Sequence, residues 1–238
     1  MTDCAFDGLL FDKDGTLIDF DKSWTDIMFK FARIAANNDE KKAHKLLETS
    51  GYDFVNKRFT GGGLLATGNV YDMTALWYPE LSHKEIESKI SELSKIASQM
   101  IGQHLTAIEG AEQTLKILKN AGFKLGIATN DSEKSAKQNI QQLGWEHLFD
   151  VILGFDSVEN PKPAGDQVKR FAKLCNLKPN RIAMIGDNVI DIAAAHAGGA
   201  FAVGVLSGNS AREQLEQDAD IILPSINALP SWLKITSS

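Results

Sequence analysis

The chain has 238 residues, of which 43% are hydrophobic, so it has room for one larger domain, a modest second domain and a packed core. Its formal net charge of −6 argues against a general affinity for nucleic acid or an anionic membrane surface, because both partners require a basic face. Cys4 and Cys175 lack the spacing of zinc or redox sites, so we expect two reduced thiols. Without a signal-peptide pattern or a membrane-length apolar run, the sequence favours a cytoplasmic protein.

Short apolar runs recur along the chain and are expected to form the strands of a sheet. They cover residues 8–11, 124–128, 151–154, 182–185, 200–206 and 221–223. From the second run onward, helix-like segments separate them, and several of these segments end at a glycine. This alternation predicts an α/β core that consists of a parallel sheet with crossover helices.

The interval between the first and second runs is too long for one crossover connection. Apolar residues follow helical spacing over residues 24–35 and again over residues 86–101. We therefore expect a separate, all-helical domain that is inserted into the sheet domain. The insertion covers residues 20–104, and the core covers residues 1–19 and 105–238.

The first apolar run ends in two carboxylates, Asp12 and Asp14, directly before Gly15, which permits a sharp turn. Alternate side chains of a strand point to the same face, and open parallel sheets place their sites at the carboxyl ends of strands. The two acids are therefore expected to project together, where they could hold a hard cation. The alternative is an ordinary turn with solvated acids. Lys13, between them, is expected to point to the other side and to be solvated.

Three further signals follow, each at the end of another apolar run: Ala128-Thr129-Asn130-Asp131, Asn160-Pro161-Lys162-Pro163 and Gly186-Asp187-Asn188-Val189-Ile190-Asp191. Each signal alone is weak, whereas the ordered set of four is specific. Together they resemble the four motifs of the haloacid dehalogenase superfamily of phosphotransferases, over nearly the whole chain. The resemblance implies a Rossmann-like core with a helical cap that is inserted after the first strand and closes over the active site.

The first motif resembles the family pattern Asp-x-Asp-Gly-Thr, which implies that Asp12 is the nucleophile and Asp14 the general acid and base. Asp12 would form an aspartyl-phosphate. Asp14 would protonate the leaving alkoxide and then deprotonate the hydrolytic water. Aspartate at this second position favours phosphoryl transfer from oxygen, because relatives that displace halide or cleave carbon–phosphorus bonds usually differ there.

The second and third motifs imply residues that contact the phosphoryl group. Thr129 and Asn130 would donate hydrogen bonds to phosphoryl oxygens, although the same pair also suits a strand-to-helix turn. Lys162 lies between two prolines, which stiffen the backbone and could aim its ammonium group into the site. Its positive charge would neutralise both the nucleophile and the transferring phosphoryl group.

The fourth motif implies the metal site. Asp187 resembles the metal-ligating acid of the family and would act with the Asp12 carboxylate and the Asp14 backbone carbonyl, an oxygen-rich set that suits Mg²⁺. Asp191 falls one helical turn further on. One role would be to orient Asp187, a water held by Asp187, or Lys162. The other would be to stabilise the helix N-terminus through its negative charge, and the two roles are compatible.

In the insertion, Lys57 and Arg58 precede Gly61-Gly62-Gly63, and Tyr71 and Trp77 follow. Such a glycine-rich loop in a cap resembles a substrate-contacting element, and an ordinary flexible connection is the alternative. The aromatic residues on the helices of the insertion are expected to be core. The five histidines are scattered without metal-ligand spacing, so none is a candidate ligand.

The predicted function is a Mg²⁺-dependent phosphatase that hydrolyses a small phosphorylated metabolite. Phosphoglycolate is the first candidate, because the motif style and cap position look most like those of phosphoglycolate phosphatases. Two alternatives stay open: a phosphomutase of the β-phosphoglucomutase type, which uses the same motifs, and a non-enzymatic binding or regulatory relative, which would be expected to lose one of the acids. The oligomeric state is not predicted.

Overall fold

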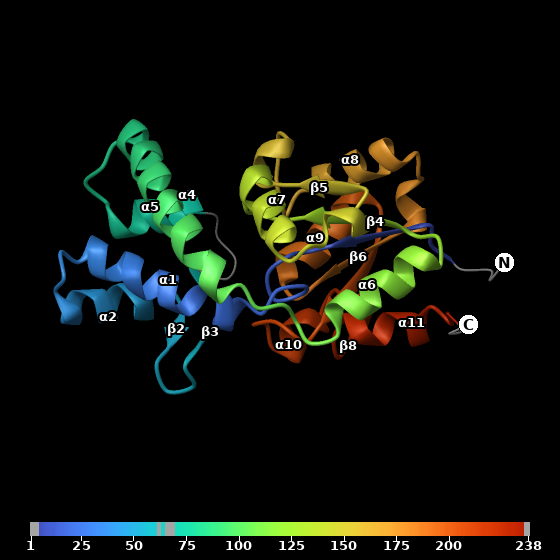
Figure 1. The fold of residues 1–238 in the computed structure, drawn as a ribbon, viewed down its shortest axis with the longest axis horizontal. Coiled ribbons are helices and arrows are strands. Elements are labelled where there is room, and N and C mark those ends of the chain that lie inside the picture. Colours follow the sequence, from blue (N-terminus) through green and yellow to red (C-terminus); the bar gives the residue numbers. More distant parts are fainter. Residues whose placement is uncertain (1–4, 61–62, 65–69, 236–238) are drawn as a thin grey trace. The chain divides into compact units, whose positions relative to one another are not determined.

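The computed structural model describes residues 5–60, 63–64 and 70–235, and it divides into two compact units. One unit comprises Met1–Asp19 with Ala107–Ser238, and the other comprises Phe20–Thr106. We call them the core unit and the inserted unit (Figure 1). The second boundary lies two residues beyond the predicted one. Cys4, Gly61 and Gly62 fall outside the described residues.

The core unit contains a six-stranded sheet in the order β5-β4-β1-β6-β7-β8, and every neighbouring pair is parallel. Its strands are β1 (Gly8–Phe11), β4 (Lys124–Ala128), β5 (Val151–Leu153), β6 (Ile182–Gly186), β7 (Phe201–Val205) and β8 (Ile221–Leu223). The expected Rossmann-like α/β core is thereby confirmed. Because the chain runs outward from β1 to one edge and then returns to β6, the strand order reverses beside β1, where such folds place their sites.

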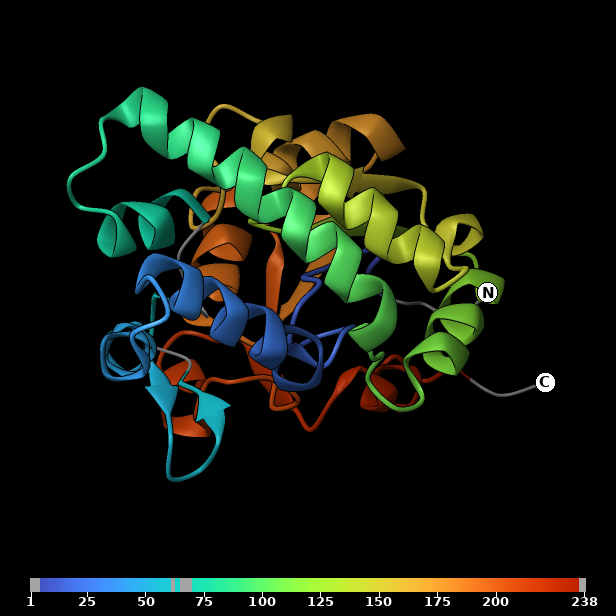
Figure 2. The same ribbon diagram turned by 60° about the vertical axis from the view of Figure 1, so that its left-hand side comes forward.

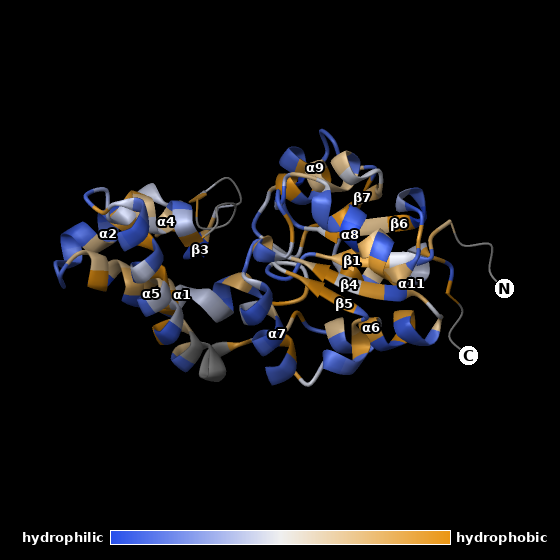
Figure 3. Ribbon diagram, turned by 90° about the horizontal axis from the view of Figure 1, so that it is seen from above, coloured by the Kyte–Doolittle hydropathy of each residue, from blue (hydrophilic) through white to orange (hydrophobic). Residues whose placement is uncertain are grey.

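Helices cover both faces of the sheet, and all of them except the last, which follows β8, lie between strands in the chain. They are α6 (Ala111–Asn120), α7 (Glu133–Gln142), α8 (Asp166–Cys175), α9 (Val189–Gly198), α10 (Arg212–Leu215) and α11 (Leu229–Trp232). Short 3₁₀ turns lie at η1 (Glu146–Leu148), η2 (Phe155–Ser157), η3 (Pro179–Arg181) and η4 (Ile226–Ala228). Figure 3 shows α8 and α9 on one side of the apolar strands and α6 and α7 on the other.

The central strands are buried on both faces, which explains their continuous apolar sequence. Leu9 and Leu10 of β1 are fully buried, and Leu10 packs with Phe171 of α8 in one apolar cluster. Gly126 of β4 makes room for this helix, since a Cβ at that position would lie 2.6 Å from the Phe171 ring. Helix α8 therefore packs closely against the middle of the sheet, beneath the strand ends.

The inserted unit contains α1 (Phe20–Ala35), α2 (Glu40–Thr49), α4 (Val70–Trp77) and the long helix α5 (His83–His104), which is prominent in Figure 2. The helices expected over residues 24–35 and 86–101 are confirmed by α1 and α5. The all-helical expectation is wrong for one segment, because β2 (Tyr52–Asp53) and β3 (Arg58–Phe59) pair as an antiparallel ribbon.

Two aromatic residues explain this ribbon. Tyr52 lies directly opposite Phe59, and both rings are buried in the apolar cluster of the inserted unit. Aromatic cross-strand pairs stabilise antiparallel strands, and here the pair also joins the core formed by α1. Across residues 5–60, 63–64 and 70–235, no helix has the length and apolar character needed to cross a bilayer.

Candidate active site

The four sequence motifs meet at the carboxyl ends of three adjacent strands. Asp12 follows β1, Thr129 follows β4 and Asp187 follows β6, and β1 pairs with both β4 and β6. The backbone amide of Asp12 donates to the carbonyl of Ile185 over 2.8 Å, so the pairing of β1 with β6 continues to the first acid. Residues separated by more than 170 positions are thus brought to one edge of the sheet.

Lys162 connects the third motif to the first and fourth. Its Nζ lies 2.6 Å from Asp12 Oδ1 and 2.7 Å from Asp191 Oδ1, and its side chain is only 2% exposed. Burial opposes a charge on this amine, but the two carboxylates outweigh that effect and raise its pKa above the ordinary value. Lys162 is therefore a fixed cation beside the proposed nucleophile.

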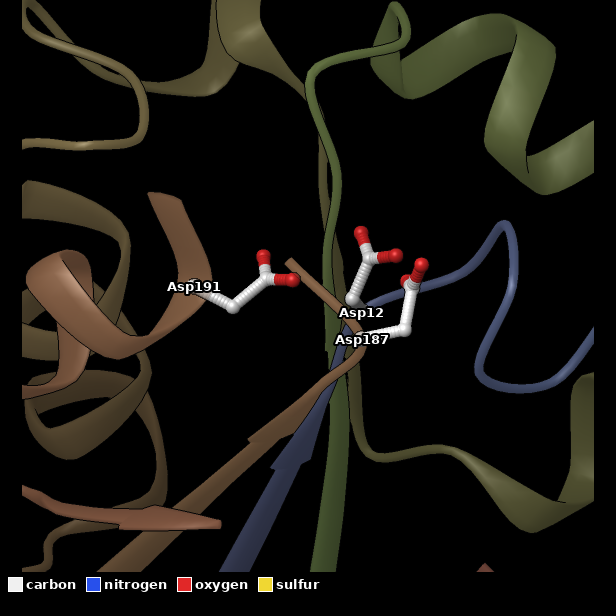
Figure 4. A group of neighbouring side chains, drawn as sticks. All are labelled: Asp12, Asp187 and Asp191. Carbon is white, nitrogen blue, oxygen red and sulfur yellow. The ribbon is translucent and has the colours of Figure 1, made fainter. Parts of the chain in front are cut away.

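Three carboxylates form a buried cluster: Asp12, Asp187 and Asp191 (Figure 4). One oxygen of each lies within 4.8 Å of the others. Burial raises the pKa of Asp12 to about 7, although Lys162 acts in the opposite direction. Burial, together with the negative charges of the other two acids, raises the pKa of Asp187 well above its usual range. The site concentrates negative charge that a bound cation would offset.

Asp191 makes contacts that are compatible with both of the roles considered for it. Its Oδ2 accepts from the Asn188 backbone amide over 3.0 Å, while Asn188 caps the first turn of α9 in return. Its Oδ1 accepts from Lys162. Gly186 permits this approach, because a Cβ there would lie 2.3 Å from the Asp191 side chain. Asp191 thus orients the lysine and begins the helix.

A loop after β7, which none of the four sequence motifs includes, completes the surroundings of Asp187. The Asn209 amide donates to Asp187 Oδ2 over 3.0 Å, and the Ser207 hydroxyl donates to the Gly15 carbonyl over 2.8 Å. A Cβ at Gly208 would lie 1.9 Å from that carboxylate, and one at Gly15 would lie 2.6 Å from it. The position of Ser-Gly-Asn at the end of another strand was the available signal.

Asp14 lies apart from the three-acid cluster. Its carboxylate accepts from Lys13 and is 20% exposed, against 11% for Asp12. The expected solvated lysine is wrong, since Lys13 is fully buried. The strand ends at Phe11, and the Lys13 carbonyl accepts from the amides of Leu17 and Ile18 in a turn. Strand alternation therefore does not extend to positions 13 and 14.

The second motif is held by backbone contacts. Thr129 Oγ1 accepts from the Asp131 amide over 3.1 Å, and Asn130 Nδ2 donates to the Lys162 carbonyl over 3.0 Å. Gln167, on α8, is fully buried and donates to the Thr129 carbonyl over 2.9 Å. Asn130 thus positions the lysine loop, and the contribution of Gln167 was not evident from sequence because it depends on how α8 packs.

The candidate loop residues of the inserted unit have different environments. Trp77 is buried and donates to Ser50 Oγ over 2.7 Å, so it belongs to the core of that unit, as expected for its aromatic residues. Tyr71 contacts His83. Lys57 has a left-handed φ of 52° in the hairpin turn, and Arg58 is exposed on β3. Of these four, only Trp77 is buried, so the other three remain candidates for contact with a ligand.

Comparison with known proteins agrees with this architecture. Residues 6–199 match the family model of haloacid dehalogenase-like hydrolases, so the chain belongs to that family. It is 27% identical to a phosphoglycolate phosphatase of Psychrobacter arcticus over 209 residues, which cover 88% of this chain and 87% of the relative. It is also 27% identical to the pyrophosphatase PpaX of Bacillus cereus over 115 residues, which cover 48% of this chain and 53% of that relative.

Solved structures share the fold. A haloacid dehalogenase-like hydrolase structure from Bacteroides fragilis superposes with a TM-score of 0.76 at 20% identity, over 94% of this chain and 99% of the other. At this level of identity, the likeness concerns the fold. Activity is therefore inferred from the residues of the site.

Proposed function

We propose that the protein is a phosphatase that hydrolyses small phosphate monoesters through an aspartyl-phosphate at Asp12. The observation that carries the proposal is the contact between Asp12 and Lys162, 2.6 Å long and buried, beside the acids Asp187 and Asp191. A carboxylate that attacks a phosphate anion meets repulsion, which the buried Lys162 cation beside the nucleophile reduces. The neighbouring acids suit a bound cation that would reduce it further. The chain keeps Asp12, Asp14, Lys162 and Asp187, which argues against a non-enzymatic relative, because such a relative would be expected to lose one of the acids.

The side chains fit a divalent cation. All donors in the cluster are carboxylate oxygens, which suit Mg²⁺, and binding would relieve the repulsion that raises the pKa of Asp187. By the family resemblance, Asp12 and Asp187 would hold the ion with the Asp14 backbone carbonyl, while Asp191 pairs with Lys162 through one oxygen and accepts from the Asn188 amide through the other. The bound ion supplies charge neutralisation for the phosphoryl group.

In the first step, an Asp12 oxygen attacks phosphorus and the bond from phosphorus to the ester oxygen breaks. Lys162 stays paired with Asp12 and Asp191 and offsets the charge on the transferring group. The Thr129 hydroxyl donates a hydrogen bond to a phosphoryl oxygen. Asp14 gives a proton to the leaving alkoxide, and its partial exposure lets it reach a leaving group that enters from solvent.

In the second step, Asp14 takes a proton from water, which attacks the phosphorus of the aspartyl-phosphate. Inorganic phosphate leaves and the Asp12 carboxylate is restored. Phosphoglycolate is the first candidate substrate, since the relative that aligns over most of both chains carries that name. The relative named as a pyrophosphatase makes pyrophosphate, an anhydride rather than an ester, the second candidate.

Release of inorganic phosphate tests the proposal. Purified protein with Mg²⁺ is given phosphoglycolate, pyrophosphate, sugar phosphates and p-nitrophenyl phosphate, with Asp12→Asn as the control. We expect release that requires Mg²⁺ and Asp12, without a bisphosphate activator. Absence of release from every compound by the folded wild-type protein would refute the proposed function, whereas transfer to a sugar that needs a bisphosphate would identify a phosphomutase.

A further inference from the structure

A second ion cluster, with a buried lysine at its centre, joins the proposed acid and base Asp14 to two residues that have no part in the mechanism above. It consists of Lys13, Asp14 and Asp131. Lys13 is among the largest fully buried side chains of the described residues. Its Nζ pairs with the Asp14 carboxylate and lies 3.2 Å from Asp131 Oδ2. A charged amine in this position links the first motif directly to the second.

Asp131 is itself anchored. Its Oδ2 accepts from Ser135 Oγ over 3.2 Å, at the start of α7, and its amide donates to Thr129 Oγ1. The lysine is thus held at one end by a carboxylate that is fixed to a helix. At the other end it holds Asp14, whose side chain is 20% exposed. A partly exposed aspartate without such a contact would sample several rotamers.

We propose that Lys13 is a positioning residue, which fixes the carboxylate of Asp14 for proton transfer by using Asp131 as its anchor. The inference rests on the proposed function, because it assigns Asp14 as the acid and base. A buried aliphatic side chain would fill the same volume without the loss of hydration that a buried charge suffers, so packing alone does not explain lysine here. A displacement of about 1 Å in a catalytic group can lower a rate about 100-fold.

The test uses two variants and a matched control. Lys13→Met removes the cation at similar length. The double variant Lys13→Met with Asp131→Asn removes one charge of each sign, so the cluster keeps its net charge. Lys119→Met is the control, because Lys119 also forms an ion pair, at 2.7 Å from Asp150, outside the motifs. Circular dichroism and thermal unfolding establish which variants fold.

The readout is the dependence of kcat/KM on the leaving group. An alkyl phosphate needs a proton from Asp14 as the alkoxide departs, whereas p-nitrophenolate leaves without one. We expect both Lys13 variants to lose about 10- to 100-fold in kcat/KM for the alkyl ester and less than about threefold for p-nitrophenyl phosphate. We also expect a burst of nitrophenolate, because hydrolysis of the aspartyl-phosphate still needs Asp14. Lys119→Met should match the wild type in both.

Three results would overturn the inference. The first is a folded Lys13→Met protein with unchanged kinetics. The second is an equal loss on both esters without a burst, which would indicate general damage to the site. The third is loss of the fold in both the single and the double variant, which would assign Lys13 to structure. An inactive wild-type protein would instead refute the proposed function.

Discussion

Replacing Asp12 by asparagine should abolish turnover and make the metal-free protein more stable. The amide resembles the protonated carboxyl in shape, but it cannot serve as the nucleophile and carries no charge. Burial raises the pKa of Asp12 from 3.8 to about 7. The folded chain therefore binds this proton more tightly than the unfolded chain does, and ionisation of Asp12 opposes folding.

The size of the effect follows from that shift. One pKa unit corresponds to about 1.4 kcal/mol, so ionising Asp12 costs the folded state at most about 4 kcal/mol near neutral pH. The repulsion among the three acids also involves Asp187 and Asp191, which are retained in the variant. We therefore expect Asp12→Asn to recover about half of this cost as a higher free energy of unfolding. For a chain of this length, ~2 kcal/mol corresponds to a rise of about 4–8 °C in Tm.

The size of the stability difference between the variant and the wild type depends on pH. Below pH 3.8 the carboxyl is protonated in both states, and the two proteins should unfold together. As pH rises from 3.8 to about 7, the stability of the wild type falls relative to that of the variant. Thermal unfolding in EDTA at pH 4.5 and pH 7.5, with phosphate release at saturating Mg²⁺, measures both effects. A Tm difference that is zero, negative or independent of pH would refute the electrostatic reasoning, and retained turnover would refute the mechanism.

Three further predictions concern the metal, the fold and the insertion. Asp187→Ala should raise the half-saturating Mg²⁺ concentration for phosphate release by about tenfold or more, and an unchanged titration would assign Asp187 to structure. Asp150 has a lowered pKa: burial raises it, but hydrogen bonds from Lys119 and the Leu125 amide outweigh burial. The Asp150 carboxylate stabilises the fold fully above pH 3.8, and this effect is lost as pH falls through its lowered pKa. In urea unfolding, Asp150→Asn should therefore lower the free energy of unfolding by about 1–2 kcal/mol at pH 7 and by less at pH 3. Equal costs at both pH values would contradict this. Arg58→Ala and Gly62→Pro should change the preference among natural esters while hydrolysis of p-nitrophenyl phosphate persists, because the reacting groups belong to the core unit; a proportional loss of both activities would place specificity elsewhere.

Much of the site is local in sequence and could be predicted from it. Asp12, Thr129 and Asp187 each follow an apolar run, and parallel strands bring their carboxyl ends to one edge of a sheet. Lys162 was predicted as a candidate by its motif, although its contacts with two acids were not. The same periodicity predicted the long helices α1 and α5, because an amphipathic stripe is repeated at every turn.

Other features depend on contacts between distant segments. Lys13 is expected to be solvated when only its strand is considered, but the chain turns after Phe11 and Asp131 arrives from the end of another strand. The glycine at position 208 matters only because Asp187 lies beside it. Neither contact has a periodic signal, since each joins residues that are more than 20 positions apart.

By itself, the sequence determined the alternation of strands and helices, the insertion after the first strand and the order of the four motifs, because these follow from local hydrophobic periodicity and residue type. Only the tertiary structure decided the ionic partners. Burial removes water from Asp12, Lys13 and Lys162, and each charge must then be balanced by whichever groups the packed strands and loops bring within a few ångströms. That balance is a property of three-dimensional neighbours.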